Sequence, residues 1–511
     1  MIITGLAVGL VLGWVMQRGR FCVTGMIRDI FLQGTWRGFT ALLIVIAVHA
    51  VGLAALTTSG VISPEFKDFA PLGVIIGGFL FGMGIVLAGG CASGTWYRSA
   101  EGLVGSWLAL LFYGLSAAAM KGGALGFLNE GLRSWTVPVT TINGALGISV
   151  WWLVIPFAIF TAVLARHFLA QEAAAPKMAT LKPKKTGLAH ILAEKSWHFY
   201  PTAAIIGVIG VIAWPLSAAA GRNDGLGITS PSSNLSKFVT TGSTDNVDWG
   251  VLLVLGLFVG AFFAAKASGE FRLRLPSGQQ AVRSVAGGIL MGVGAAAAGG
   301  CTVGNGMVQT SLFTFQGWIA LLFIAIGIFA ASKLWLKPTD PVNAQDISPI
   351  SSDATPSTPT SANQERLSAP ADLGFQTTGV ALLERRDTAV AAESVERVAS
   401  GKNIPGLQLV GDSTYKLDTL GAVCPFPLID AKDVMKHLDV GESLQIEFDC
   451  TQATDAIPRW AATDGHEVTE FEQTSEAGWT ITVKKGAVGL GGAAASPLDQ
   501  NLLRNSRKNG L

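Results

Sequence analysis

The chain has few charged residues, and this scarcity excludes a wholly soluble protein. Only 14% of its 511 residues are Asp, Glu, Lys or Arg, whereas 50% are hydrophobic and the mean hydropathy is +0.46. Several apolar runs approach the roughly 20 residues that cross the hydrocarbon core of a bilayer. The 62 glycines suit close contacts between helices in lipid. We therefore expect a mostly helical protein that crosses a membrane several times.

Cysteine is also scarce, and several common motifs are absent. The five cysteines stand at positions 22, 91, 301, 424 and 450, with no CxxC or metal-ligand spacing. The wide spacing of the five cysteines therefore indicates neither a disulfide framework nor a zinc site. No GxxxxGKS or GxxxxGKT motif is present, which argues against ATP-driven pumping by this chain. No basic leader precedes the first hydrophobic run, so we expect that run to be a spanning helix. We expect no metal, no cofactor and no nucleic-acid partner.

Hydrophobic runs predict about nine membrane spans, and the Lys and Arg residues predict their orientation. The spans cover approximately residues 2–17, 38–58, 72–90, 102–120, 147–166, 200–220, 249–267, 284–299 and 316–336. With the N-terminus outside, most Lys and Arg residues fall in inner loops, and the outer loops carry only Lys67, Lys121, Arg133, Arg222 and Lys237. This bias predicts an outside N-terminus and a cytoplasmic C-terminal part, in the inner membrane of the cell.

A short phrase occurs twice and points to an internal repeat. Residues 77–94 read GGFLFGMGIVLAGGCASG, and residues 287–304 read GGILMGVGAAAAGGCTVG. In the predicted topology the two copies run in opposite senses, as in an inverted repeat. Interrupted hydrophobic segments at matching positions of two halves are typical of the substrate path of a transporter. A weaker likeness between the spans from Gly9 and from Gly256 does not fit this scheme, because those two spans are predicted to be parallel.

Three stretches between spans are too short or too polar to cross a bilayer. They cover residues 21–33, 91–101 and 301–315, and we expect them to form half-helices that dip into the protein. Non-helical backbone at membrane depth is tolerated only where protein or a water-filled cavity surrounds it. The three stretches are therefore predicted to lie in the interior, away from lipid.

Two cysteines stand at the predicted breaks between spans. Cys91 follows Gly90, and Cys301 follows Gly300, where each half-helix would begin. Backbone N–H groups and a partial positive charge gather at such a position and favour an anion or a thiolate. A buried cysteine is more often inert packing, but packing alone does not require equivalent placement in two halves. We therefore predict that Cys91 and Cys301 line a substrate path and that Gly90 and Gly300 help to attract an anion.

A third cysteine and its basic neighbours suggest the kind of substrate. Cys22 follows Arg18 and Arg20, two candidates for attracting an anion at the edge of a span, whereas Arg98 fits equally well as an ordinary residue of an inner loop. Thiols, cationic groups and backbone amides together suit an anion that carries its own sulfur. Two interpretations of the thiols stay open: weak S–H donors along a path, or groups that react transiently as persulfides.

On these residues the chain resembles the YeeE/YedE family of membrane proteins. The resemblance covers roughly residues 1–336 and rests on RGRFC ending at Cys22, GGCASG around Cys91 and GGCTVG around Cys301. It implies uptake of thiosulfate along a path that these three cysteines line. It also implies an hourglass-like helical body in which inward-pointing loops meet near a positively charged centre.

The composition changes after residue 337, and the chain is predicted to have four parts. Residues 1–337 form the transport domain, and residues 338–414 form a flexible linker, rich in Pro and Ser at its start, with a short helix within 373–400. Residues 415–485 alternate between strand and helix patterns in the order βαβαββ. Residues 486–511 are expected to be a disordered tail.

The small α+β domain carries a second candidate site. Cys424-Pro425-Phe426-Pro427 stands between the first strand pattern and the first helix pattern. A thiol at a helix N-terminus has a larger thiolate fraction, and Pro425 and Pro427 suit the start of a helix. This CPxP signature resembles the TusA family of sulfur carriers over residues 415–485, which implies a persulfide on Cys424. Cys450 has no role in that resemblance. It either partners Cys424 or is incidental, and we favour the second interpretation.

Together these features predict thiosulfate uptake across the inner membrane, with a tethered cytoplasmic domain that accepts or relays sulfur. Thiosulfate and the lipid bilayer are the expected partners, and cytoplasmic sulfurtransferases are further candidates. Two alternatives remain: transport of another sulfur or selenium species, and a membrane-anchored sulfurtransferase whose helical body only docks partners. Whether the chain also acts as an enzyme depends on the carrier domain and stays open.

Overall fold

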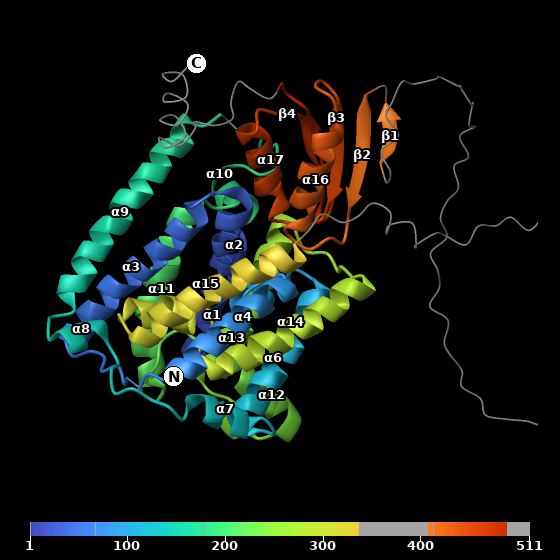
Figure 1. The fold of residues 1–511 in the computed structure, drawn as a ribbon. Helices are drawn as coiled ribbons and strands as arrows, with labels where there is room; N and C mark the ends of the chain where they lie inside the picture. The colour runs from blue at the N-terminus through green and yellow to red at the C-terminus, as the bar shows by residue number, and fades with distance from the viewer. Residues whose placement is uncertain (1, 67, 177, 337–406, 412, 488–511) are drawn as a thin grey trace, which may run out of the picture. The chain divides into compact units, whose positions relative to one another are not determined.

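Helices form nearly all of the N-terminal part of the structure, and a small sheet with two helices forms the C-terminal part (Figure 1). The computed structural model describes residues 2–336 and 407–487, apart from residues 67, 177 and 412. By their contacts, the described residues before and after the gap belong to one unit. Most of the predicted linker, the short helix expected within 373–400 and the tail from residue 488 lie outside the described residues.

Each of the nine predicted spans coincides with a long helix. These helices are α1 (Ile3–Arg18), α3 (Arg37–Thr58), α4 (Pro71–Leu87), α6 (Val104–Gly122), α9 (Trp151–Ala174), α11 (Phe199–Ala219), α13 (Trp249–Ser268), α14 (Gly278–Ala297) and α15 (Phe315–Trp335). Shorter elements connect them: α2 (Val23–Gln33), α5 (Ala92–Ala100), α7 (Gly126–Arg133), α8 (Ile142–Leu146), α10 (Gly187–Ala189), η1 (His190–Glu194), α12 (Thr229–Thr241), η2 (Thr244–Asn246) and η3 (Gly304–Gln309).

Within the described residues, 8 helical segments are long and apolar enough to cross a membrane. Two of these segments join a long helix to the short one after it, at Ile3–Gln33 and Pro71–Ala100. Helix α14 is not among the 8, since its first turns, GQQAVRS, are polar. The chain is therefore a multi-pass membrane protein, and the number of spans stays a prediction.

The long helices contact one another in a reciprocal pattern. Helix α1 packs on α13, and α11 packs on α3; α6 packs on α14, and α15 packs on α4. The pattern is reciprocal if α1 corresponds to α11, α3 to α13, α4 to α14 and α6 to α15. The α1–α13 contact then corresponds to the α11–α3 contact, and the α6–α14 contact corresponds to the α15–α4 contact. Helices α4 and α14, which carry the duplicated phrase, also pack on each other. An internal repeat would produce this reciprocity, although the repeat itself stays a prediction.

Glycines of the duplicated phrase let α4 and α14 approach until their backbones touch. Gly77 of α4 lies against Gly294 of α14, and Gly84 lies against Gly287. A Cβ atom at any of these four positions would collide with the backbone of the other helix. Because the residue numbers rise along one helix while they fall along the other, the two helices are antiparallel.

The likeness between the spans from Gly9 and from Gly256 has a packing explanation. In α1, a Cβ at Gly9 or Gly13 would meet the backbone of α13, and one at Gly256 or Gly260 would meet the backbone of α1. The contacts advance along both helices in the same direction, so α1 and α13 are parallel, as predicted. Both helices need glycine on the face that meets the other, which accounts for the similar sequences.

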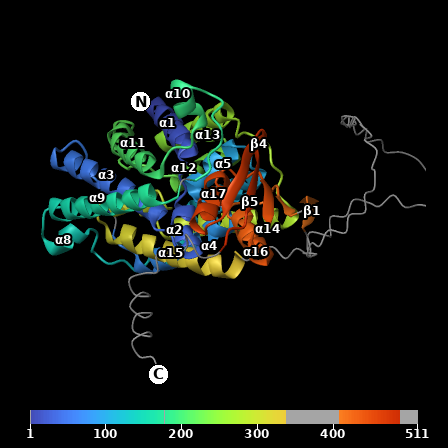
Figure 2. The ribbon, with the colours of Figure 1, turned by 90° about the horizontal axis from the view of Figure 1, so that it is seen from above.

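Helix α9 lies at the side of the helical body, next to α3 (Figures 1 and 2). Its large apolar side chains are exposed, as in Trp152 (73%) and Val163 (64%). Such exposure on a helix of this length suits contact with lipid tails, because they accept apolar surface that water would not.

The three stretches predicted as half-helices are short elements with largely buried residues. Residues 21–33 contain α2, residues 91–101 contain α5, and residues 301–315 contain η3. Every residue of α5 is buried. The prediction that these stretches lie in the protein interior is therefore confirmed by their burial. That they enter the membrane as half-helices stays a prediction.

The C-terminal part is a sheet with the order β1-β2-β3-β5-β4, whose helices α16 and α17 pack against its strands. Its elements are β1 (Gln408–Gly411), β2 (Thr414–Thr419), α16 (Phe426–His437), β3 (Ser443–Phe448), α17 (Ala453–Thr463), β4 (Glu467–Ser475) and β5 (Gly478–Lys484). Strands β2 and β3 are parallel, and the other pairs are antiparallel. The predicted order βαβαββ is correct from β2 onward, and β1 lies before the predicted start at residue 415.

Candidate functional site

Cys22 and Cys91 are brought together from different parts of the chain. Cys22 is the N-cap residue of α2, and Cys91 is the N-cap residue of α5, so both thiols stand where a short helix begins. Their Sγ atoms are 4.0 Å apart, and both residues are buried. The Cys91 sulfur also accepts a hydrogen bond from the backbone N–H of Gly94 at 3.4 Å. The helix-start position predicted for Cys91 is therefore confirmed, and Cys22 holds the same kind of position at the start of α2.

Cys301 lies at the turn that opens η3 and is fully buried. Its carbonyl oxygen accepts a hydrogen bond from the backbone N–H of Asn305 at 2.8 Å. Its thiol contacts the hydroxyl of Tyr113 on α6, and that hydroxyl donates to Thr229 Oγ1 at 2.8 Å. Tyr113 was not a predicted site residue, and no local motif marks it.

Glycines end the two helices that precede the repeated cysteines Cys91 and Cys301. The left-handed residues that end α4 and α14 are Gly89 (φ 73°) and Gly299 (φ 79°), the first glycine of each predicted Gly-Gly break. The predicted anion-attracting residues Gly90 and Gly300 follow them directly. The guanidinium of Arg98 donates a hydrogen bond to the carbonyl of Gly89. Arg98 is buried, so in this structure it does not extend to a membrane surface.

The two arginines predicted to attract an anion both contact one carboxylate. Arg18 is 1% exposed and forms an ion pair with Glu270, and Arg20 Nη2 lies 3.0 Å from Glu270 Oε1. Gln17 Nε2 donates to the same carboxylate at 2.7 Å. Burial alone would raise the pKa of Glu270, but the two guanidinium groups outweigh it and hold that pKa below its ordinary value. The charge of Arg18 is thus compensated inside the protein.

A cavity of about 310 Å³ lies between Cys22 of the helical part and Cys424 of the C-terminal part. Cys22 and Cys424 both line it, and so do Arg20 and Arg28, whereas Arg18 does not. Arg28 Nη1 also donates to the carbonyl oxygen of Cys424 at 3.4 Å. Of the two predicted anion-attracting arginines, only Arg20 is therefore placed to meet an anion in this cavity.

Cys424 precedes α16 in the loop after β2, and Pro425 and Pro427 stand at the start of that helix, as predicted. A disulfide joins Cys424 to Cys450, with the Cα atoms 6.1 Å apart. The interpretation of Cys450 as incidental was therefore wrong. The cause lies in the sheet, because the loops after the parallel neighbours β2 and β3 emerge at the same edge.

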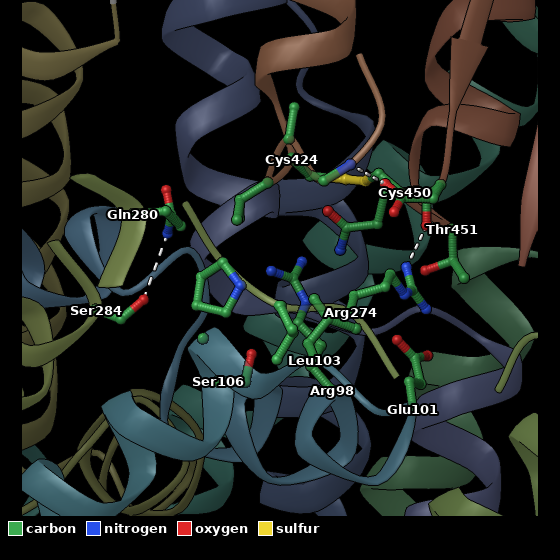
Figure 3. A pocket seen from close by; sticks show the side chains of 18 of the residues that line it. Arg98, Glu101, Leu103, Ser106, Arg274, Gln280, Ser284, Cys424, Cys450 and Thr451 are labelled. Carbon is green, nitrogen blue, oxygen red and sulfur yellow. Dashed lines mark hydrogen bonds between the residues drawn. A yellow bond between two sulfur atoms is a disulfide. The ribbon is translucent and has the colours of Figure 1, made fainter. Parts of the chain in front are cut away.

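A second, smaller cavity of about 40 Å³ is lined by both of these cysteines (Figure 3). Arg98 and Arg274 point into the same region, and Arg274 donates a hydrogen bond to the carbonyl oxygen of Asp449. Burial raises the pKa of the Asp449 carboxyl despite the neighbouring Arg274. Two cations and two sulfur atoms thus share one small space.

Within the part of the chain that the structure describes, no three His, Cys, Asp or Glu residues are grouped to hold a metal ion. The chemistry that this arrangement offers is that of sulfur, cationic groups and helix N-termini. Such groups bind an anion through charge and N–H donors and exchange sulfur through thiolates.

The fold and the site thus define a multi-pass membrane transport protein with buried thiols and an attached domain that has a reactive-cysteine loop. The sulphur transport family matches residues 18–330, and the sulfurtransferase TusA family matches residues 415–485. The chain belongs to the sulphur transport family, and its C-terminal part is a TusA domain. Both predicted resemblances are confirmed.

Named relatives cover each part separately. The thiosulfate transporter TsuA of Escherichia coli is 49% identical over 341 residues, which are 66% of this chain and 96% of that protein. The thiosulfate transporter TsuA of Spirochaeta thermophila is 33% identical over 341 residues, 64% of this chain and 97% of that protein. The putative sulfur carrier protein TsuB of Escherichia coli is 56% identical over 70 residues, 14% of this chain and 93% of that protein.

Proposed function

We propose that this chain brings thiosulfate into the cell through its helical part and passes sulfur to its own TusA domain. The Cys424 thiolate attacks the terminal sulfur of thiosulfate and becomes a persulfide, while the sulfur–sulfur bond of thiosulfate breaks and its electron pair leaves with sulfite. The path runs past Cys22, Cys91 and Cys301. The comparisons support joining these two roles in one chain. A transporter is similar to the first two thirds of the chain, and a putative sulfur carrier is similar to its C-terminal domain.

One observation carries this proposal: Cys22 and Cys424 line the same cavity of about 310 Å³. A thiosulfate ion that leaves the neighbourhood of Cys22 would therefore meet the carrier thiol within the same cavity. The 4.0 Å between the sulfur atoms of Cys22 and Cys91 supports a second contact point immediately before it. Several weak contact points allow an ion to leave as readily as it enters.

The charges around the cavity suit a doubly negative guest. Arg20 and Arg28 contribute guanidinium groups to its wall, and Arg37 and Arg459 contribute two more. Asp29 and Asp455 compensate part of that charge, since Asp29 accepts a hydrogen bond from Arg28 at 2.9 Å. A partly compensated wall attracts an anion without holding it tightly, which transport requires.

The proposed orientation puts the N-terminus outside and the TusA domain in the cytoplasm, in the inner membrane. The distribution of Lys and Arg supports it. In the cytoplasm the carrier thiol can reach sulfurtransferases, which we propose as its downstream partners.

Thiosulfate-dependent growth of a sulfur-auxotrophic host tests the proposal. The wild-type chain should support growth, and Cys91→Ala and Cys301→Ala should abolish it, because each removes a thiol from the buried path. Cys424→Ala should reduce growth less, since import continues without the carrier. Protein levels in the membrane must match across the variants, and unchanged growth of both path variants would contradict the proposal.

A competition assay separates thiosulfate from other cargo. Uptake of labelled thiosulfate is measured with an excess of unlabelled sulfate, sulfite, selenite or thiosulfate. We expect unlabelled thiosulfate to compete best, because it alone of the four carries a terminal sulfur for the thiols. Stronger competition by selenite would point to the alternative cargo.

A further inference from the structure

Cys450 is a buried nucleophile that the proposed function does not use. Cys424 and Cys450 are each 7% exposed, and their Cα atoms are 6.1 Å apart. That separation lies within the range of about 4.4–6.8 Å that a disulfide spans. The two residues are 26 positions apart in sequence, so only the fold brings them together.

The sheet holds the two cysteine loops together independently of the sulfur atoms. The loop with Cys424 follows β2, the loop with Cys450 follows β3, and the last residues of these parallel strands, Thr419 and Phe448, are paired. The backbone N–H of Gly421 donates to Asp449 Oδ1 at 3.0 Å, which ties one loop to the other. A reduced Cys450 thiol would therefore stay next to Cys424.

Both cysteines stand near the start of a helix and share a cavity with the cations Arg98 and Arg274 and the carboxyl groups of Glu101 and Asp449. Cys424 lies two residues before α16, and Cys450 lies three residues before α17, so each is near the positive end of a helix. The backbone N–H of Ala453, the first residue of α17, donates to the carbonyl oxygen of Cys450 at 3.0 Å. Arg98 and Arg274 line the small cavity that both cysteines share (Figure 3).

We propose that Cys450 is a resolving thiol, which releases the sulfur carried on Cys424 as hydrosulfide. This step rests on the proposed function, in which Cys424 carries a persulfide. The Cys450 thiolate attacks Cys424 Sγ, and a sulfur–sulfur bond forms between the two cysteines. The bond from Cys424 Sγ to the terminal sulfur breaks, and its electron pair leaves with that sulfur as HS⁻.

The electrons balance within this step. The terminal sulfur gains two electrons, and the two cysteines together lose two as they become a disulfide. A dithiol reductant of the thioredoxin class then reopens the disulfide by thiol–disulfide exchange and is itself oxidised.

A single-turnover experiment on the full-length chain tests this inference. The purified, fully reduced protein in detergent is loaded with sulfur from tetrasulfide, freed of excess reagent and kept without reductant. We expect the wild type to release one hydrosulfide per loaded chain and to end with the Cys424–Cys450 disulfide. The Cys450→Ser variant should keep the added sulfur on Cys424 and release hydrosulfide at least about tenfold more slowly, because it lacks a nucleophile held in place.

Two readouts separate this inference from the proposed function. Mass analysis of the peptide with Cys424 shows whether sulfur was loaded, and loading of Cys450→Ser shows that this variant keeps a functional domain. Failure of Cys450→Ser, which cannot release sulfur by this step, to load sulfur on Cys424 would contradict the carrier role itself. Normal loading with equal release rates in the wild type and Cys450→Ser would overturn only the resolving role, as would transfer of the added sulfur onto Cys450.

Discussion

Single residues decide the charge balance near Cys22. Glu270 accepts hydrogen bonds from Gln17 and from both Arg18 and Arg20, and it follows α13 rather than lying within it. A buried guanidinium without its counter-ion costs much more than an exposed one. Glu270 therefore allows Arg18 to be buried, and it also pairs with Arg20, which lines the cavity beside Cys22.

Glu270→Gln should destabilise the protein strongly. The amide leaves the buried Arg18 and its neighbour Arg20 without their carboxylate, and breaking a buried pair in this way costs about 3–5 kcal/mol. The expected result is a clear fall in the thermal unfolding midpoint of the protein in detergent.

Asp224→Asn is the matched control for that substitution. Asp224 pairs with Arg222 at 3.0 Å, but its side chain is 54% exposed. Exposed pairs contribute at most about 1 kcal/mol, so the unfolding midpoint should hardly move. Equal effects of the two substitutions would show that burial of the Glu270 pair is not important.

At the scale of elements, glycine faces set how closely the helices pack. Helices α1 and α13 meet along Gly9, Gly13, Gly256 and Gly260, and α4 meets α14 along the glycines of the duplicated phrase. In lipid, van der Waals contact between small residues replaces the hydrophobic effect as the main attraction between helices. The breaks that carry Cys91 and Cys301 follow these closely packed helices directly, so their positions depend on that packing.

Gly260→Ala should loosen the contact between α13 and α1. The added methyl group would collide with the carbonyl oxygen of Leu10, so the two helices must separate. Overpacking of this kind costs about 1–3 kcal/mol. The variant should unfold at a lower temperature and accumulate to a lower level in the membrane.

Gly131→Ala serves as the control, because a methyl group there meets nothing within 4 Å. Gly131 lies inside α7, where alanine favours the helix by up to about 1 kcal/mol over glycine. Its unfolding temperature should stay the same or rise. A lower unfolding temperature for Gly131→Ala than for Gly260→Ala would contradict the packing argument.

At the scale of the whole molecule, two functions are joined in one chain. The helical part matches the sulphur transport family and the C-terminal part is a TusA domain. Under the proposed function, joining the carrier domain to the transporter raises the effective concentration of the Cys424 thiol at the end of the proposed path. The shared cavity lined by Cys22 and Cys424 is where that advantage would act.

Removal of residues 338–511 should leave part of the thiosulfate uptake. The helices from α1 to α15 all lie before the cut, so the proposed path through the membrane is retained. Uptake is measured in cells with equal amounts of truncated and full-length protein in the membrane. Full-length Cys424→Ala, which lacks only the carrier thiol, should resemble the truncated chain. A truncated protein that reaches the membrane but takes up nothing would favour the anchored sulfurtransferase.

Much of this architecture follows from local sequence. All nine predicted spans are helices, because an apolar run of sufficient length forms a helix almost wherever it is placed in lipid. The CPxP loop and the strand and helix pattern around it also depend on neighbours in sequence. Strand β1 was missed because its four residues, Gln408–Gly411, are too few for a recognisable alternation.

Contacts between distant segments were decided only by the tertiary structure. Cys22 and Cys91 are 69 residues apart, and Arg18 and Glu270 are 252 residues apart, yet each pair is in contact. Cys450 became a partner of Cys424 because two parallel strands end at the same edge of a sheet. Periodicity and motifs describe one segment at a time. Which segments then meet depends on how helices and strands pack, and no single segment carries that information.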